Sequence, residues 1–465
     1  MLTKFKQISL VLIGVAAGIL LSLNFSATAQ REASRFPLPV DELRAFAEVF
    51  GAIKSSYVEP VEDKKLITEA ISGMLTGLDP HSAYLDQEAF RELRVGTQGE
   101  FGGLGIEVSM EDGFVKVVSP IEDTPAFRAG LKPGDFIIKI DDTSVKGMTL
   151  NDAVKRMRGK PKTSIRLTIM RKGETKPFEV TLVRDVIRVQ SVKSKLIEPG
   201  YGWVRISQFQ ERTGENLVKA LDNLYKGGQL KGLVLDLRND PGGLLNGAVG
   251  IASAFLQPKV LVVSTDGRTE SSKRKFVAAP EDYMGGGEED FLKALPAGVK
   301  TVPMVVLVNS GSASASEIVA GALQDYKRAT IMGTQTFGKG SVQTILPLGN
   351  NTAIKLTTAR YYTPSGRSIQ AKGIEPDVVV EDPSAPVGMR LREADLEKHL
   401  ANDQDAQAEM KRKQEAARPA GGAEDKPQAP LEFASEKDFQ FQQALRYLKG
   451  QPLVKAQSAP PAKKN

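Results

Sequence analysis

The sequence lacks cysteine altogether and has very little histidine. Without cysteine the chain can have no thiol nucleophile, disulfide framework, cysteine-ligated metal or lipoprotein anchor. Only His81 and His399 can supply an imidazole. The usual base of a serine nucleophile is therefore nearly unavailable.

A dense run of basic residues is also missing. The formal charge is +6, and no Lys/Arg block is interleaved with aromatic residues. Nucleic-acid-binding proteins need such an electrostatic footprint, so we expect no nucleic-acid partner. The composition, 41% hydrophobic and 25% charged, is that of an ordinary globular protein. A length of 465 residues predicts two or three domains.

The N-terminus has the pattern of an export signal. Lys4 and Lys6 precede an almost unbroken apolar stretch at 8–25, and Ala27-Thr28-Ala29 then fits the small-x-small pattern of signal peptidase. Residues 1–29 are therefore predicted to be a signal peptide. Because the stretch is nearly long enough to span a bilayer, an uncleaved membrane anchor is the alternative. Either way we expect the rest of the chain outside the cytoplasm, which in a bacterium means the periplasm.

Three regions follow this segment. Residues 30–94 carry apolar side chains at helical spacing, which predicts an N-terminal helical region. Residues 95–185 combine short alternating strands, glycine-rich turns and two helices, which predicts a small, partly open β-barrel. Between residues 186 and 382 apolar strands alternate with helices, and this alternation predicts a covered, largely parallel sheet.

Two segments have little core-forming sequence. Residues 266–297 are polar and rich in glycine, so we expect a long surface insertion. Residues 383–465 predict a charged helix, a disordered linker and a short helix at 437–449. The apolar face of that last helix and the N-terminal helices are expected either to self-associate or to pack on the chain's own core. The residues of this face are Phe441, Ala444, Leu445 and Leu448.

A serine-rich turn lies at a predicted strand-to-helix junction. A strand ends at Val308, small residues follow, and a helix begins near Ser316. Hydroxyls at such a junction are exposed at the sheet edge, beside the unpaired N–H groups and positive potential of the helix N-terminus. Helix capping is the alternative, since Ser-x-x-Glu is a capping box, and it is favoured when the segment is taken alone.

A lysine between two glycines favours a reactive serine over simple helix capping. Gly338-Lys339-Gly340 follows a strand and Phe337, a setting that a solvated surface charge does not explain. An apolar pocket would lower the pKa of the ammonium until the amine can act as a base. Because imidazole is so scarce, a Ser–Lys dyad is the natural nucleophile–base pair.

A Pro-Gly-Gly turn follows another predicted strand. Pro241-Gly242-Gly243 can aim backbone N–H groups into a cleft. Together with the Ala315 N–H, this turn can form an oxyanion hole, which needs two donors aimed at the developing negative charge. A simple tight turn is the alternative, and local sequence favours the two equally.

These three segments, in this order, resemble the C-terminal processing (tail-specific) peptidases. That family of serine proteases has a crotonase-like fold with an inserted PDZ domain. The resemblance covers about residues 40–382 and includes Asp79-Pro80-His81-Ser82 and the stretch 355–366. The 25-residue step to Lys339 selects Ser314 as the nucleophile, rather than Ser312 or Ser316.

The resemblance implies an α/β core of the crotonase/ClpP type at 186–382, with a PDZ domain inserted at 95–185. It makes Ser314 the nucleophile and Lys339 the general base, and Gln343 is similar to a glutamine that supports the lysine.

It also implies roles for several neighbours of the dyad. Gly242 and Ala315 match the oxyanion donors, with Gly243 as an open alternative to Gly242. Asp325 matches an acidic position after the nucleophile helix, with a role more structural than catalytic. His81 is likewise expected to be structural.

The resemblance gives the PDZ segment a peptide-binding role. The loop Gly102-Gly103-Leu104-Gly105 would hold a peptide C-terminal carboxylate through its backbone amides, while the substrate adds as a strand. Arg158 is similar to an arginine that senses bound peptide and connects the PDZ domain to the active site. A solvated charge at a helix C-terminus is an equally favoured alternative.

The expected function is a PDZ-regulated serine endopeptidase that cleaves periplasmic proteins from or near their C-termini. Its partners would be proteins or peptides with free C-termini, a second copy of the chain and an activating adaptor protein. No cofactor or metal is implied. The alternative is a non-catalytic periplasmic PDZ scaffold on a crotonase-like fold.

Overall fold

The computed structural model describes residues 38–121, 123–285, 289–383, 391–404 and 432–454. The chain falls into two units, Met1–Gly73 and Met74–Asn465, and each is described by itself. The predicted signal peptide and the predicted charged helix and linker after residue 404 lie outside the described residues. Within those residues, no helix combines the length and the apolar character needed to cross a bilayer.

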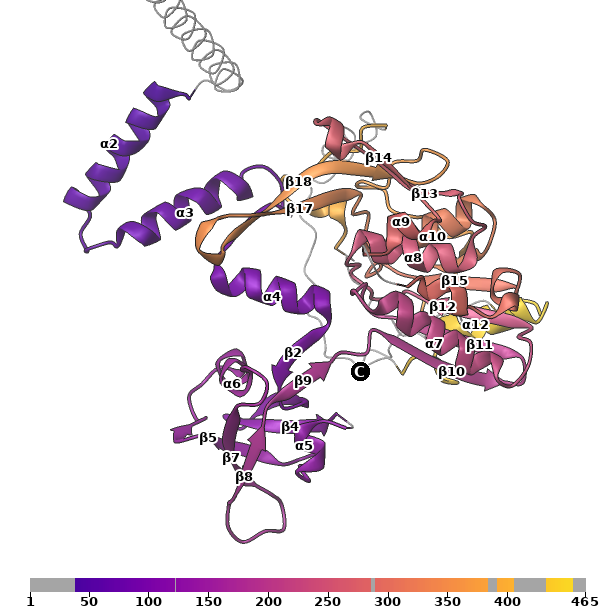
Figure 1. Cartoon of the computed structure of the whole chain (residues 1–465), viewed down its shortest axis with the longest axis horizontal. Coiled ribbons are helices and arrows are strands. Elements are labelled where there is room, and N and C mark those ends of the chain that lie inside the picture. The colour runs from indigo at the N-terminus through magenta and orange to yellow at the C-terminus, as the bar shows by residue number, and fades with distance from the viewer. Residues whose placement is uncertain (1–37, 122, 286–288, 384–390, 405–431, 455–465) are drawn as a thin grey trace, which may run out of the picture. The chain divides into compact units, whose positions relative to one another are not determined.

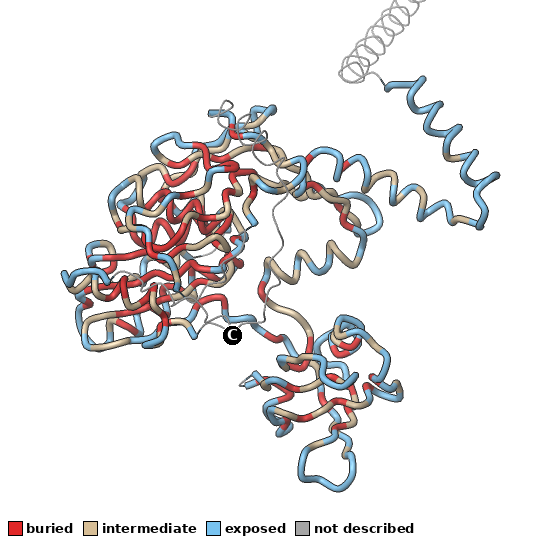
Figure 2. The backbone as a smooth tube through the Cα atoms, turned by 180° about the vertical axis from the view of Figure 1, so that it is seen from behind, coloured by how far each residue is buried: buried red, intermediate tan, exposed pale blue. Residues whose placement is uncertain are grey.

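The first unit contains α2 (Val40–Ser56) and the start of α3 (Asp63–Thr76), as the apolar spacing predicts. None of the side chains of α2 is buried. Its apolar residues Leu43, Phe46 and Val49 are each about half exposed, and Figure 2 shows the helix as exposed along almost all of its length. Among the described residues of its unit, nothing therefore buries the apolar side chains of this helix.

The second unit begins with two elements that the sequence did not separate. The predicted helical region contains a short strand, β1 (Ala83–Leu85), and then α4 (Gln87–Gln98), which runs past residue 95. Asp86 caps α4 by accepting the Ala89 N–H, and Gly99 ends it in the left-handed conformation (φ 71°). β1 forms because it pairs with β18, a contact that local sequence cannot reveal.

Residues 100–188 form the predicted β-rich domain. Its main sheet has the order β3-β4-β5-β7-β8, with β6 on β5, and all of its pairs are antiparallel. Two helices and a two-stranded β2–β9 ribbon complete it (Figure 1). The elements are β2 (Glu100–Gly103), β3 (Ile106–Glu111), β4 (Phe114–Pro120), α5 (Pro125–Arg128), β5 (Phe136–Ile140), β6 (Thr143–Ser144), α6 (Leu150–Met157), β7 (Ser164–Met170), β8 (Phe178–Val183) and β9 (Asp185–Arg188).

The α/β core is built on a six-stranded sheet of order β10-β11-β12-β15-β16-β19. All of its pairs are parallel except β10–β11 at the edge, so the prediction of a largely parallel sheet is confirmed. The strands are β10 (Val192–Glu198), β11 (Tyr201–Ile206), β12 (Gly232–Asp236), β15 (Met304–Val308), β16 (Thr330–Gly333) and β19 (Val378–Val379).

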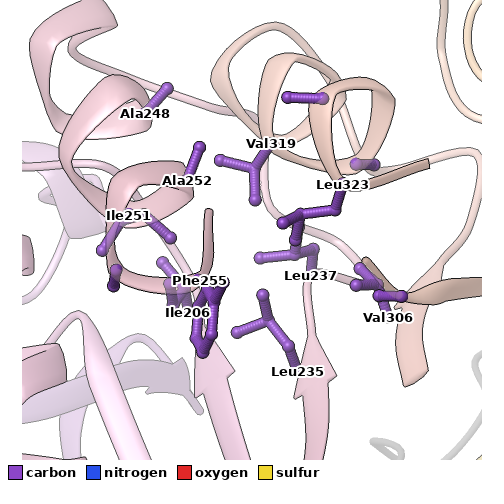
Figure 3. Packing of buried hydrophobic residues seen from close by; sticks show 14 of the residues in the cluster. Ile206, Leu235, Leu237, Ala248, Ile251, Ala252, Phe255, Val306, Val319 and Leu323 are labelled. Atoms are coloured by element: carbon purple, nitrogen blue, oxygen red, sulfur yellow. The ribbon is translucent and has the colours of Figure 1, made fainter. Parts of the chain in front are cut away.

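Helices cover both faces of this sheet. On one face, α7 (Thr213–Tyr225), α8 (Leu245–Phe255) and α10 (Ala315–Asp325) pack on alternate strand residues such as Leu235 and Val306 (Figure 3). On the other, α12 (Phe439–Leu448) packs on the intervening residues, including Val234 and Val305. Strands buried on both faces read as continuous apolar runs, which is why the sequence identified them.

The short helix α12 belongs to this core. Phe441 and Ala444 are fully buried against Trp203 and Met332. The expectation that this helix offers a self-association surface was therefore wrong, and its alternative, packing on the chain's own core, is confirmed. The apolar face of α12 is buried against the chain's own core.

A second sheet, β1-β18-β13-β14 with β17 on β18, lies largely outside the sequence prediction. The segment 266–297 was expected to be a long surface insertion, and most of its described residues are exposed or half-buried. It is nevertheless attached to the fold, because β14 pairs with β13, and Tyr283 and Phe291 pack on the main core. The elements not yet given are β13 (Leu261–Gly267), η1 (Glu270–Ser272), β14 (Arg274–Val277), α9 (Pro280–Tyr283), η2 (Phe291–Ala294), η3 (Ala297–Lys300), β17 (Ser341–Pro347), η4 (Gly349–Asn351), β18 (Ala353–Tyr362) and η5 (Glu393–Asp395).

Candidate active site

Ser314 occupies a strained turn between β15 and α10. Its backbone has φ 57° and ψ −113°, a region that non-glycine residues rarely adopt. Such a turn projects the side chain of a strand-to-helix elbow away from the sheet. Ser314 is partly exposed, and α10 begins at the next residue. The strained backbone thus coincides with the serine selected from the sequence.

The two neighbouring serines are engaged elsewhere. The buried Ser312 hydroxyl donates to Leu237 O (2.7 Å), and the buried Ser316 hydroxyl donates to Asp240 O (3.0 Å). Both bonds tie the serine turn to the loop that follows β12. Asn309 strengthens this connection, because its Nδ2 donates to Asn239 Oδ1 (2.8 Å).

The Pro-Gly-Gly turn lies directly against Ser314. A Cβ atom on Gly242 would come within 2.8 Å of the Ser314 Cβ and 2.9 Å of the Ala315 N. Gly242 has φ 97°, so both its conformation and this close approach require glycine. The structure therefore brings together Ser314, Ala315 and Gly242, as the sequence predicted.

The N–H of Gly242, however, is already engaged. It donates to Asp240 Oδ1 (2.9 Å), while Gly242 O accepts the Phe209 N–H. Within the described chain no backbone carbonyl accepts the N–H of Gly243 or of Ala315. Of the two glycine amides that the sequence left open, Gly243 is the one available to a ligand in this structure.

Asp240 is a fully buried carboxyl group beside this turn. Its Oδ2 has no hydrogen-bond partner among the described residues. Burial raises the pKa of Asp240 to about 7, and the hydrogen bond from the Gly242 N–H opposes this effect. The turn thus contains a titratable group that can change charge near neutral pH.

Lys339 lies in a loop whose backbone is held by buried side chains. Glu317 accepts the Gly338 N–H at Oε1 (2.7 Å) and the Lys339 N–H at Oε2 (2.9 Å). Gln370 Oε1 accepts the Gly340 N–H (2.9 Å), and the Tyr361 hydroxyl donates to Lys339 O. These four hydrogen bonds fix the peptide units on both sides of the lysine.

Glu317 also joins this loop to the nucleophile turn. Its Oε2 accepts the Ser314 N–H (2.8 Å) as well as the Lys339 N–H, so one carboxylate oxygen holds the backbone of both residues. The capping box expected from Ser-x-x-Glu is therefore present, and it has a second function. Burial raises the pKa of Glu317 to about 7, against the opposing effect of these hydrogen bonds and that of Thr336.

The environment of Lys339 favours a neutral amine. Burial lowers the pKa of Lys339, and the charge of Lys355 lowers it further. The carboxylates of Glu393, Glu317 and Asp79 act in the opposite direction. Among the described residues, no hydrogen bond joins the Lys339 ammonium to the Ser314 hydroxyl. Such bonds are often long before substrate binds.

Gln343 contributes to a polar chain on the neighbouring strands. Its Nε2 donates to Ser341 Oγ (3.1 Å) and Thr357 Oγ1 (3.2 Å), and Thr357 donates to Asp79 Oδ1 (3.0 Å). Burial raises the pKa of Asp79, but hydrogen bonds from Ser82, His81 N–H and Thr357 outweigh it and hold the pKa below its ordinary value. The structure thus connects Gln343 to Asp79 and shows no direct bond from Gln343 to Lys339 among the described residues.

Asp325 lies at the far end of α10 from Ser314. It forms an ion pair with Arg367, and its Oδ2 accepts the Ser365 N–H (2.9 Å). These contacts fasten the turn after β18 to the end of the helix. The geometry agrees with a structural role for this carboxylate.

In the β-rich domain, only part of the predicted peptide-binding set lines a cavity. Gly102 and Arg158 line one of about 710 Å³, with α4 on its other side. The Arg158 guanidinium stacks on the Phe101 ring at 4.7 Å. Leu104 and Gly105 are buried, and a Cβ on Gly105 would meet Thr124 at 2.3 Å. The loop is therefore closely packed against the start of α5.

The sequence assigned no role to several residues of the site. Glu317 was seen only as a helix cap, and the others come from segments scattered between residues 79 and 393. Within the described residues, no group of His, Asp or Glu is placed to hold a metal ion. The missed residues are Asp79, Asp240, Thr357, Tyr361, Gln370 and Glu393.

The arrangement suits acyl transfer. An exposed serine on a strained elbow, backbone N–H groups beside it and a partly buried amine on a fixed loop are the components such chemistry requires.

Three family models match the chain. The model of peptidase family S41 matches residues 200–380, and a PDZ domain model matches residues 102–182. A model described as the N-terminal domain of the activating protease CtpB matches residues 21–89.

Known proteins of the same organisation are similar over most of the chain. A carboxy-terminal-processing protease of Bartonella bacilliformis is 45% identical over 447 residues, covering 94% of this chain and 95% of that protein. The carboxy-terminal processing protease CtpA of Bacillus subtilis is 37% identical over 385 residues, covering 82% and 78%. A solved photosystem II D1 C-terminal processing protease is 30% identical, covers 72% of this chain and 92% of that one, and has a TM-score of 0.40.

The family models and the two similar bacterial proteases favour the enzyme over the alternative of a non-catalytic scaffold. The family models, together with the sheets and helices of the structure, confirm the fold class expected from the sequence, an α/β peptidase core with a PDZ domain and N-terminal helices. The chain belongs to peptidase family S41, among the carboxy-terminal processing serine proteases that carry a PDZ domain.

Proposed function

We propose that this peptidase cleaves its substrates with a Ser314–Lys339 dyad. Neutral Lys339 takes the hydroxyl proton of Ser314, whose Oγ attacks a peptide carbonyl carbon. The protonated lysine then gives its proton to the leaving amine, and water releases the acyl group from Ser314 by the reverse sequence. The observation that carries the proposal is the single Glu317 oxygen that binds the backbone N–H of both Ser314 and Lys339.

The oxyanion of the tetrahedral intermediate would be held by backbone N–H groups. We assign one to Ala315, at the first position of α10, where the helix dipole adds positive potential. The second is the N–H of Gly243, since that of Gly242 is bound by Asp240. Gly242 would then serve by allowing the turn to approach Ser314 closely.

The dyad is tested by separate substitutions of each member. Ser314→Ala, Lys339→Ala and Lys339→Arg should each lower kcat/KM for a peptide substrate by at least about 10³-fold, with unchanged circular dichroism. Lys339→Arg is informative because a guanidinium keeps its positive charge and cannot act as a base. The matched control is Lys226→Ala, an exposed lysine on the same core.

A fluorophosphonate label provides an independent test. It should modify Ser314 alone, and peptide mapping should find Ser312 and Ser316 unmodified because their hydroxyls are bonded to carbonyls. Full activity in Lys339→Arg, or a label on another serine, would refute the dyad.

We further propose that the PDZ domain regulates this site by binding the free C-terminus of a substrate. Basic side chains that line the 710 Å³ cavity include Arg158 and Lys160, and their charge suits a terminal carboxylate. Glu88 and Glu92 line it as well, and Glu88 is paired with Lys155 (2.7 Å), so Lys155 is not counted toward that charge. Gln343, through Thr357 and Asp79, would support the lysine loop.

Export, self-association and an adaptor complete the proposal. Cleavage after Ala29 would make Gln30 the first residue of the mature protein, which N-terminal sequencing can determine; retention of the segment would instead associate the enzyme with a membrane.

The exposed apolar face of α2 suits a second copy of the chain or an adaptor. Sedimentation that finds only monomers at every concentration would refute self-association.

A further inference from the structure

A hydrogen-bonded histidine–glutamate pair lies beside the lysine loop and has no role in the mechanism above. His81 Nε2 is 3.0 Å from Glu393 Oε1 and 2.8 Å from Glu393 Oε2. The Glu393 side chain is fully buried, and that of His81 is 17% exposed. Because a carboxylate can only accept, His81 Nε2 carries the hydrogen that lies between them.

Glu393 is connected to the lysine loop on both sides of Lys339. Its backbone N–H donates to Phe337 O (3.1 Å). Its Oε1 accepts from Gln370 Nε2 (2.9 Å), and the same amide group accepts the Gly340 N–H at Oε1 (2.9 Å). A movement of Glu393 would therefore be transmitted to the residues just before and just after the lysine.

His81 is fixed from the opposite side of the site. Its backbone N–H donates to Asp79 Oδ1 (2.8 Å), which also accepts the Thr357 hydroxyl (3.0 Å). The ring thus has a backbone anchored to β18 and a side chain that points to Glu393. Hydrogen bonds thus connect β18, His81, Glu393 and the lysine loop to one another.

The charges around Lys339 give this pair a second effect. Lys355 on β18 favours the neutral amine, whereas Glu317 on α10, Asp79 before β1 and Glu393 favour the ammonium. An unpaired Glu393 carboxylate would thus work against a lysine that must lose its proton. The hydrogen bond from His81 Nε2, at 2.8 Å, weakens that effect, because its N–H dipole partly offsets the carboxylate charge where it arises.

We propose that His81 and Glu393 form a positioning pair for Lys339, in which the His81 Nε2–H holds the Glu393 carboxylate and, through it, the loop on both sides of the lysine. The inference rests on the proposed role of Lys339 as the general base. It differs from a purely structural role because it assigns the ring N–H an effect on the proton affinity of the lysine.

The test compares variants that remove the ring's hydrogen-bond donor or the carboxylate charge. His81→Phe removes the donor, and its acid limb of kcat/KM should move to higher pH by about 0.5–1 unit, a roughly three- to tenfold loss on that limb. His81→Gln keeps an N–H donor for Glu393 and should leave the limb in place. Glu393→Gln should move the limb to lower pH, and the double variant of His81→Phe with Glu393→Gln should resemble Glu393→Gln. His399→Gln, at the only other histidine, is the matched control and should leave the limb in place.

A second measurement does not depend on turnover. The Lys339 amine can be titrated by NMR with lysine labelled with ¹⁵N at Nζ in a Ser314→Ala background, the signal being assigned by its loss in Lys339→Arg. The amine should titrate at higher pH in His81→Phe and at lower pH in Glu393→Gln. Folded His81→Phe and Glu393→Gln proteins whose limb and titration stay within about 0.2 unit of the parent would overturn the inference.

The two measurements separate this inference from the proposed dyad. An unmoved titration with an inactive Lys339→Ala protein would refute the pair and leave the dyad intact. A shifted titration with an active Lys339→Ala protein would support the pair's effect on the amine and refute the dyad. Loss of activity in His81→Phe equally at every pH, with an unmoved limb, would reduce the pair to a structural contact and so overturn its proposed role.

Discussion

At the scale of single residues, the site is organised by carboxylates that bind backbone N–H groups. Glu317 holds the nucleophile and the lysine loop, and Asp240 holds the Gly-Gly turn. Each of these carboxylate oxygens accepts a hydrogen bond from a main-chain N–H group, whose position does not depend on side-chain rotamers. This places the reacting groups within a fixed frame, which is the requirement for preorganised catalysis.

Asp240 should make the stability of the protein depend on pH. The pKa of this carboxyl is raised from 3.8 to about 7 on folding. Its contribution to the free energy of unfolding is therefore present below about pH 4 and is lost as the pH rises through 7. Asp240→Asn should remove this dependence, so its stability relative to the parent should rise between pH 4 and 8 by an amount on the order of 3 kcal/mol.

Urea unfolding at several pH values measures this difference. Asp222→Asn, at an exposed carboxylate on the same core, is the control and should show a flat difference. A flat difference for Asp240→Asn as well would show that this carboxyl does not titrate between pH 4 and 8. Activity should be compared in the same samples, since Asp240 also holds the Gly242 N–H.

At the scale of secondary-structure elements, α12 is joined to the end of β12 by a buried ion network. Arg238 binds Asp236 at Oδ2 (2.7 Å) and Asp438, the N-cap of α12, at both oxygens (2.8 and 2.7 Å). All three side chains are essentially inaccessible to solvent. Arg238 directly precedes the loop that approaches Ser314, so the last helix supports the site from the far face of the sheet.

Breaking this network should be costly. Asp438→Asn should lower the free energy of unfolding by about 3 kcal/mol or more, because it removes one partner of a buried charge. Trp203, the only tryptophan of the chain, donates to Asp236 Oδ2 (3.2 Å), so its fluorescence reports unfolding of this region. Glu436→Gln, an exposed neighbour, should change stability by less than about 0.5 kcal/mol. A similarly small change in Asp438→Asn would contradict the network's importance.

The elements also show how far the sequence alone could lead. Strands such as β12 and β15, buried on both faces, were identified from their apolar runs, and the turn at Ser314 from its small residues. The β17–β18 hairpin was missed because its residues are mostly half-buried and carry polar side chains. β1 exists only through pairing across the chain.

The same distinction applies to the site. Ser314, Lys339 and Gly242 stand in short motifs with a chemical meaning of their own. Glu393 contacts His81 across 312 positions of the sequence, and Gln370 reaches the lysine loop from 30 positions away. Such supporting residues have no local signature. They can be recognised only when the fold brings them together.

At the scale of the whole molecule, the chain combines a PDZ domain with a peptidase core. If the PDZ cavity binds a terminal carboxylate, a free C-terminus should be part of what the enzyme recognises. A peptide with an amidated C-terminus should then be cleaved with a kcat/KM at least about tenfold lower than its free acid, since charge-assisted hydrogen bonds are worth about 1.5–3 kcal/mol each.

Matched peptides of one sequence test this prediction. The free-acid and amidated forms should be compared with the parent enzyme and with Arg158→Ala, which should reduce the difference between them. Equal cleavage of both forms by the parent enzyme would contradict a regulatory role for the carboxylate. Lys172→Ala, distant from the cavity residues in the sequence, serves as the surface control.

The hydrogen bonds between the two catalytic loops have a consequence for evolution. Ser312 donates a hydrogen bond to Leu237 O, Ser316 donates one to Asp240 O, and Asn309 is hydrogen-bonded to Asn239. A bulkier side chain on one loop would displace the other, so mutations in these two stretches should be accepted mainly in compensating pairs. Among descendants of a common ancestor, residues 238–243 and 309–316 should therefore covary, although some 70 positions of sequence separate them.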